Sequence, residues 1–176
     1  MTGPAVDLAL VEQFLNTLDE RTFTWHGKKW IPCDKLSSVE TLGAWLEAHD
    51  LVAAGQKLRA SDLADAVALR TALREALTDS TQATEALARF PLRLAPDPSG
   101  RLRITAIRCV AGLDTIVETI AASVAGGGWN RLKLCRAEDC RWAFYDTSRS
   151  GGGRWCSMEA CGNRYKTRAY RRRHTT

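Results

Sequence analysis

The chain has 176 residues and a formal net charge of +5, and 45% of its residues are hydrophobic. This length is sufficient to bury a hydrophobic core without disulfide bonds, and the composition is typical of a folded globular protein. No apolar run reaches the ~18 residues that a membrane-spanning helix needs, and the N-terminus lacks the pattern of a secretory signal. We therefore expect a cytoplasmic protein without a membrane partner.

The positive charge is concentrated near the C-terminus. Residues 131–176 contain 12 Lys and Arg residues against 4 Asp and Glu residues, a net charge of +8, whereas residues 1–130 contain 13 against 16, a net charge of −3. A basic segment joined to a mildly acidic remainder is typical of a module that binds a polyanion. A charged tail that only interacts with solvent is the alternative.

Apolar residues recur at three- and four-residue spacing through most of the chain, and this periodicity predicts helices. The expected helices cover residues 6–19, 39–49, 62–79, 81–89 and 107–125. Ser37 and Glu40 match the capping box that starts a helix. Asn16 and Thr17 are interpreted as residues that end the first helix rather than as functional groups.

Two segments predict β-hairpins. Residues 22–32 have β-type residues on both sides of a His-Gly turn, and Trp25, His26 and Trp30 form a candidate ligand pocket there, with packing in the core as the alternative. Residues 92–94 and 102–104 flank an A-P-D-P-S-G turn and are expected to pack against the helices. The polar face of this second hairpin carries Arg93, Arg101 and Arg103. Contact with solvent is favoured for these arginines over contact with phosphates.

Four cysteines carry the strongest chemical signal in the sequence. Cys135 and Cys140 form one C-x4-C pair, and after fifteen residues Cys156 and Cys161 form a second. Two matched pairs supply the four soft ligands of a tetrahedral zinc ion, and a closed set of four leaves no position for a catalytic water. We therefore expect one structural Zn²⁺ and no enzymatic activity. Two disulfides and four unrelated buried thiols are the alternatives.

The other two cysteines, Cys33 and Cys109, are interpreted as an ordinary thiol and a small buried residue, respectively.

The residues around these cysteines predict a treble-clef-like finger. Residues 132–134 and 142–146 are strand-like, residues 147–153 form a flexible turn, and residues 154–156 are expected as the returning strand. Ser157 is a suitable N-cap for a helix over residues 160–173. The aromatic residues of the finger could stack on bases, but burial of the finger against the helical part is favoured.

The predicted C-terminal helix is basic and has no acidic residue after Glu159. Guanidinium groups bind phosphates, so this helix is the candidate nucleic-acid interface. The residues assigned to it are Arg164, Lys166, Arg168, Arg171, Arg172 and Arg173. Asn163 and Arg164 are suited to adenine and guanine edges, respectively. The alternatives are a bond from Asn163 to the backbone of the cysteine turn and an ion pair of Arg164 with Asp146 or Glu159. Asn163 is interpreted as structural and Arg164 as functional.

The sequence Cys161-Gly162-Asn163-Arg164, preceded by D-T-S-R and a tryptophan–cysteine step, resembles the CGNR zinc-finger family over about the last 45 residues. Residues 14–18, 42–51 and 72–77 are similar, more loosely, to the domain that precedes this finger in bacterial stress-induced transcription regulators. The resemblance implies zinc binding and nucleic-acid binding by the finger. It implies much less about the preceding domain.

Together these features predict an α+β protein. Three glycines at residues 126–128 suggest a boundary between a mostly helical domain with a small β-hairpin, residues 1–128, and a zinc finger, residues 129–176. We expect a DNA-binding regulator whose first domain binds a small-molecule effector or forms a homodimer. An RNA-binding factor is the alternative, and a protein-binding finger attached to an enzyme is disfavoured because no catalytic motif is visible.

Overall fold

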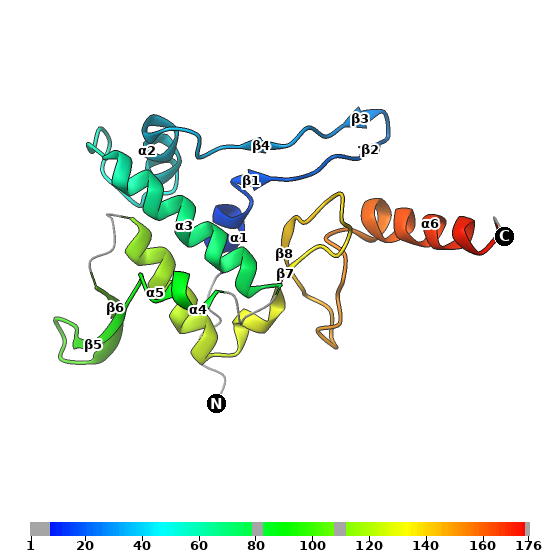
Figure 1. Ribbon diagram of the computed structural model, residues 1–176. Helices are drawn as coiled ribbons and strands as arrows, with labels where there is room; N and C mark the ends of the chain where they lie inside the picture. Colours follow the sequence, from blue (N-terminus) through cyan, green and yellow to red (C-terminus); the bar gives the residue numbers. More distant parts are fainter. Residues whose placement is uncertain (1–7, 79–82, 108–111, 175–176) are drawn as a thin grey trace.

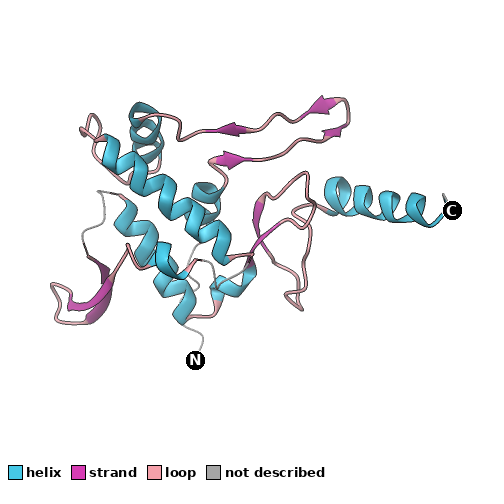
Figure 2. Cartoon of the chain, viewed as in Figure 1, coloured by secondary structure: helices cyan, strands magenta, loops and turns pink. Residues whose placement is uncertain are grey.

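The computed structural model describes residues 8–78, 83–107 and 112–174. Within these ranges most of the regular structure is helical and the strands are short (Figures 1 and 2). The helices are α1 (Ala9–Leu15), α2 (Val39–Ala48), α3 (Ala60–Ala76), α4 (Thr84–Leu87), α5 (Leu113–Ala125) and α6 (Asn163–His174), with a 3-10 turn η1 (Gly128–Arg131) and a π-helical turn η2 (Met158–Gly162).

The strands form two-stranded antiparallel pairs in the described ranges. The pairs are β1 (Leu18–Asp19) with β4 (Cys33–Asp34), β2 (Thr24–Trp25) with β3 (Lys28–Lys29), β5 (Leu92–Pro96) with β6 (Leu102–Ala106), and β7 (Leu132–Leu134) with β8 (Ala143–Tyr145). The predicted α+β class, with a mostly helical first part, is therefore confirmed.

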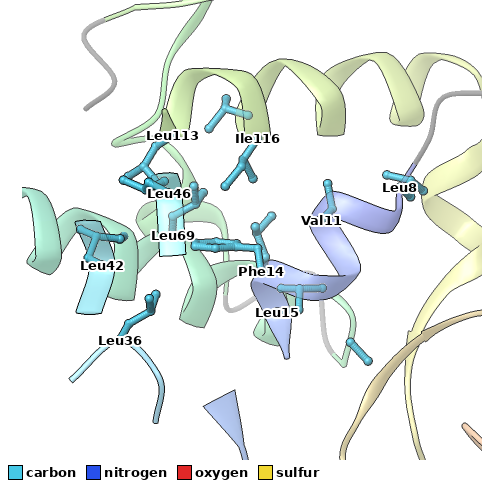
Figure 3. Close-up of a cluster of buried hydrophobic side chains, with 14 of the residues drawn as sticks. Leu8, Val11, Phe14, Leu15, Leu36, Leu42, Leu46, Leu69, Leu113 and Ile116 are labelled. Atoms are coloured by element: carbon cyan, nitrogen blue, oxygen red, sulfur yellow. The ribbon is translucent and has the colours of Figure 1, made fainter. Parts of the chain in front are cut away.

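The main hydrophobic core lies where helices α1, α2, α3 and α5 meet (Figure 3). Phe14, Leu46 and Ile116, from three different helices, are fully buried in it. Burial of a side chain of this size contributes about 1.5–3 kcal/mol, so this cluster is the main source of stability in the N-terminal domain. Leu132 and Ala143, from strands β7 and β8, belong to the same core.

Strand β8 is also joined to helix α1 by hydrogen bonds. The buried side chain of Asn16 donates to the carbonyl of Ala143 at 2.9 Å and accepts from the amide of Ala143 at 2.8 Å. Asn16 therefore fixes the start of the finger to the helical part, and its predicted structural role is confirmed. The boundary predicted between residues 128 and 129 stays a prediction, but the segments on its two sides share one core.

Residues 18–34, here called the N-terminal ribbon, run out from the core and back (Figure 1). Strand pairs β1–β4 and β2–β3 hold its two arms together, with a hydrogen bond from the Trp30 amide to the Phe23 carbonyl between them. The buried guanidinium of Arg70 on α3 anchors the base of the ribbon through two hydrogen bonds of 2.6 Å to the Asp34 carboxylate. These bonds lower the pKa of Asp34.

Several predicted boundaries need correction. Helix α2 is capped by Ser38, whose hydroxyl accepts from the Thr41 amide at 3.3 Å, one residue after the predicted Ser37. Helix α3 begins at Ala60, before the predicted residue 62, because the Asp62 carboxylate accepts from the Arg59 amide and completes the first turn. The helix predicted over residues 6–19 ends at Leu15, and Leu18–Asp19 form strand β1. The predicted start at residue 107 is described and is not helical, and α5 begins at Leu113. The start predicted at residue 81 and Cys109 lie outside the described residues.

The returning strand predicted at residues 154–156 is wrong. Strand β8 pairs instead with β7, which precedes the first cysteine pair. The segment 154–156 makes a single backbone hydrogen bond of 2.9 Å, from the Arg136 amide to the Arg154 carbonyl. A three-residue strand has too few apolar positions for the sequence to distinguish between two neighbouring partners.

The β5–β6 hairpin forms at the predicted place, but its apolar face is only partly covered. Leu94 and Leu102 remain 70% and 73% exposed, whereas Leu92 and Ile104 line a hollow of about 480 Å³ beside helix α5. On the opposite face Arg103 lies 3.5 Å from Glu118, so this predicted surface arginine is partly paired.

Replacement of Asn16 by alanine tests the connection between helix α1 and the finger. Asn16→Ala would leave the amide and the carbonyl of Ala143 buried without their partner, so we expect a loss of about 2–4 kcal/mol in the free energy of unfolding. Urea denaturation followed by circular dichroism measures this. Gln13→Ala removes an exposed side chain of the same helix and should change stability by about 0.5 kcal/mol or less; equal effects of the two changes would contradict the assignment.

Candidate metal centre and basic helix

The four predicted ligand cysteines converge on one point. The sulfurs of Cys135, Cys140, Cys156 and Cys161 all lie within 4.8 Å of one another. The Sγ–Sγ distances are 3.6 Å from Cys140 to Cys156 and 3.7 Å from Cys156 to Cys161. A tetrahedron with Zn–S bonds of about 2.3 Å has edges of about 3.8 Å, so the sulfurs are spaced as a zinc ion requires. The site therefore fits the predicted metal.

The first pair of cysteines lies in a tight turn after strand β7. The Cys135 amide donates to the Trp142 carbonyl and the Cys140 amide to the Ala137 carbonyl, both at 2.9 Å. Arg141 leaves this turn with a positive φ of 50°, a conformation uncommon for non-glycine residues. The turn thus brings both sulfurs to one side and returns the chain as strand β8.

The second pair of cysteines lies at the start of the C-terminal helical segment. The Ser157 hydroxyl accepts from the Ala160 amide at 3.2 Å, as predicted for an N-cap, and the Ser157 carbonyl accepts from the amides of Cys161 and Gly162 at 3.0 Å. A side chain at Gly162 would place its Cβ 2.8 Å from the sulfur of Met158. Met158 is 53% exposed and its flexible end can move aside, so this contact does not by itself require glycine.

Arg164 follows this glycine and connects several parts of the finger. Its guanidinium donates to Asp139 at 2.6 Å and to the sulfur of Cys161 at 3.3 Å, and it lies 3.5 Å from the centre of the Phe23 ring. The side chain is only 17% exposed. A cation at this place offsets the negative charge that four thiolates leave on a zinc centre. Arg164 is thus engaged within the finger, and its ion pair is with Asp139.

Arg21 of the N-terminal ribbon also contacts the finger. Its guanidinium lies 3.8 Å from the ring centres of both Trp30 and Trp142, between ribbon and finger, and Asp19 holds it with bonds of 2.6 and 2.8 Å. Cation–π contacts of this kind contribute roughly 0.5–2 kcal/mol each. Burial was predicted for four aromatic residues of the finger. Trp142, Phe144 and Trp155 are partly buried in the cluster that includes the cysteines and Phe23, whereas Tyr145 is 41% exposed.

A buried carboxylate organises the glycine-rich turn at residues 147–153. Asp146 accepts from Lys133 Nζ at 2.6 Å and from the amides of Ser148 and Gly153 at 3.0 and 2.7 Å. The Lys133 bond, followed by those from Ser148, lowers the pKa of Asp146. A Cβ at Gly153 would lie 2.7 Å from this carboxylate, so the residue must be glycine. The turn is consequently tied to strand β7.

Helix α6 extends away from the remainder of the molecule, toward the C-terminus (Figures 1 and 2). Lys166 and the arginines at 171–173 are exposed, and Arg168 is 58% exposed although it pairs with Asp139 at 2.7 Å. The helix contains no acidic residue. The structure therefore presents the predicted basic residues on one protruding element, and two of them, Arg164 and Arg168, share the Asp139 carboxylate of the finger.

The three residues of the candidate ligand pocket are used differently from one another. Trp25 and Trp30 pack against the finger's aromatic cluster, whereas His26 is exposed in the turn of the β2–β3 hairpin, where its ring meets that of Trp25 at 4.3 Å. A ligand at this place stays a prediction.

The sequence did not predict the apolar hollow beside α5, because the residues that line it come from four separate segments. Its volume is typical of ligand sites.

The fold and the site define a zinc-finger protein in which a mostly helical domain carries a basic C-terminal helix. Two family models match it: residues 131–174 match the model described as "CGNR zinc finger", and residues 8–127 match the one described as "Putative stress-induced transcription regulator". The chain belongs to this regulator family, and its CGNR zinc finger binds one structural zinc ion through the four clustered cysteines.

No curated protein was similar enough to match. Among the described residues, no helix is long and apolar enough to span a membrane.

The zinc content of cysteine variants tests the ligand set. We expect native mass spectrometry to show one zinc ion per wild-type chain. Cys161→Ser removes one of four thiolates and should lose the ion to a chelator at a concentration that leaves the wild type loaded. Cys33→Ser is the matched control, because Cys33 is exposed and lies outside the cluster. Loss of zinc from both variants, or from neither, would contradict this ligand set.

Proposed function

We propose that this protein is a DNA-binding transcription regulator that contacts duplex DNA through helix α6. The observation that carries the proposal is an exposed row of basic side chains on a helix whose first turn belongs to the zinc centre. Membership of a transcription-regulator family supports a nucleic-acid partner. The zinc ion has no direct role in binding; the protein uses it to fix the start of α6.

The charges of α6 suit contact with the sugar–phosphate backbone. Guanidinium groups form two parallel hydrogen bonds to a phosphate, and each phosphate contact releases counterions from the DNA. The affinity should therefore fall steeply as the salt concentration rises. Asn163, which is exposed at the start of α6, is suited by its amide group to an adenine edge. Arg164 contributes indirectly, because its guanidinium is held by Asp139 and Cys161.

The N-terminal domain is proposed to regulate the finger by binding a small-molecule effector or by forming a homodimer. The apolar hollow beside α5 supports a hydrophobic contact on this domain, since its lining residues include Phe90, Ile120 and Val124. No catalytic activity is part of the proposal, because a zinc ion with four thiolate ligands has no open position for a substrate or a water.

An RNA-binding factor is the second candidate, and a specific observation favours it. Tyr165 and Tyr170 of α6 are 46% and 59% exposed, and the ring of Tyr165 lies 4.7 Å from that of Trp155. Exposed aromatic rings beside arginines are typical of proteins that stack on unpaired bases. Competition between a duplex and a structured RNA of equal length separates the two candidates, because the regulator should retain the duplex.

Removal of the terminal arginines tests the interface. In fluorescence anisotropy with a short labelled duplex, Arg171/Arg172/Arg173→Ala should weaken binding and lower the slope of log affinity against log salt by about 2–3, since each phosphate contact contributes about 0.9. Arg93/Arg101/Arg103→Ala is the matched control, with the same loss of charge on the β5–β6 hairpin and its turn. Unchanged binding by the first variant, or an equal loss in both, would count against α6 as the interface.

A further inference from the structure

The tip of the N-terminal ribbon lies beside helix α6, and the two elements line an open hollow of about 300 Å³. Trp25 lines this hollow from the ribbon, and Thr167, Arg168 and Arg171 line it from α6. The walls come from parts of the chain separated by more than a hundred residues. The hollow therefore belongs neither to the finger alone nor to the helical domain alone.

The register of the hairpin determines which lysine lies on the same face as Trp25. Trp25 is opposite Lys28, and Thr24 is opposite Lys29. Residues directly opposite each other in an antiparallel pair point to the same face, so Lys28 shares the face of Trp25 while Lys29 lies on the other. Consistent with this, Lys28 Nζ lies 4.0 Å from the ring centre of Trp30, which packs against the finger. Both lysines are exposed.

Direct contacts hold the ribbon against the finger. The Thr22 amide donates to the Asp139 carbonyl at 3.0 Å, and Phe23 lies beneath the guanidinium of Arg164. At the tip, His26 and Gly27 have positive φ angles of 47° and 74°, as in the type I′ turn that keeps a two-residue hairpin compact. The position of Lys28 relative to α6 is thus fixed by the fold.

We propose that the ribbon tip is the second wall of the nucleic-acid site, and that one sugar–phosphate strand of the bound DNA lies between Lys28 and the arginines of α6. This inference rests on the proposed function and adds residues of the N-terminal domain to the interface. The hollow accommodates a sugar and a phosphate but is much too small for a duplex about 20 Å across. Trp25 offers an aromatic surface for the sugar or a base.

The charges in the hollow determine where the phosphate lies. Glu159 lines one side, so a phosphate is expected toward Arg168 and Arg171 rather than at that end. Arg168 shares the Asp139 carboxylate with Arg164, and a phosphate can replace Asp139 as its partner while Arg164 keeps Asp139 in place. Trp25 forms the opposite wall, and Lys28, on the same face of the hairpin as Trp25, supplies a positive charge beside it.

Comparison of two neighbouring lysines tests the inference. Lys28→Ala and Lys29→Ala remove the same charge from opposite faces of one hairpin, and neither lysine is buried. Affinity for a short labelled duplex is measured by anisotropy over a series of salt concentrations, with the zinc content and the circular dichroism of both variants as folding controls. Lys28→Ala should lower the salt slope by about 0.9 and weaken binding roughly fivefold, and Lys29→Ala should leave the slope unchanged.

The outcomes distinguish this inference from the proposed function. If both lysine variants bind like the wild type while Arg171/Arg172/Arg173→Ala binds weakly, the ribbon is not part of the site and the role of α6 stands. Equal losses in the two lysine variants would show a long-range effect of charge and would also overturn the inference. If an acidic peptide of equal charge displaces the duplex and binds with the same dependence on Lys28, the occupant is not specifically nucleic acid. Failure of the wild type to bind would overturn both proposals.

Discussion

The closure of four cysteine sulfurs around one zinc ion is the constraint on which the C-terminal finger of this structure depends. A segment of fewer than fifty residues has too little apolar surface to fold by itself, so metal binding supplies the missing free energy. The four thiolates bring two negative charges more than the zinc ion neutralises. The guanidinium of Arg164, which donates to Cys161 and Asp139, is placed to balance them.

The finger is nevertheless built into the helical domain rather than attached to it. Asn16 bonds to both backbone groups of Ala143, and the N-terminal ribbon contacts the finger through Arg21 and Phe23. A change in the helical domain can therefore reach α6 through packed side chains and hydrogen bonds, without a flexible linker between the two. This arrangement agrees with the proposal that the helical domain controls nucleic-acid binding by α6.

Much of this architecture could be predicted because its signals are local. The spacing of the cysteines identified the zinc ligands, apolar periodicity placed helices such as α5, and the N-cap residue Ser157 placed the C-terminal helical segment. The start of α2 was missed by one residue, at Ser38, because two adjacent serines offered alternative caps. The returning strand at 154–156 was wrong because a short strand carries little information about its partner.

The features missed by sequence reasoning depend on contacts between distant residues. No local pattern connects Asn16 with Ala143, or Arg21 with Trp142, and only folding brings these pairs together. The same holds for Arg164, whose partner Asp139 lies in the other cysteine turn. The aromatic residues Trp25 and Trp30 suggested a pocket in the sequence, whereas their rings pack largely against the finger.

X-ray absorption at the zinc edge, on protein purified without added metal, tests the central claim most directly. The account predicts a single shell of four sulfur atoms at about 2.3 Å, with no nitrogen or oxygen ligand. That shell would establish that the two cysteine turns are closed around one ion at the start of α6. A shell that contains nitrogen or oxygen, or native protein without zinc, would contradict the account.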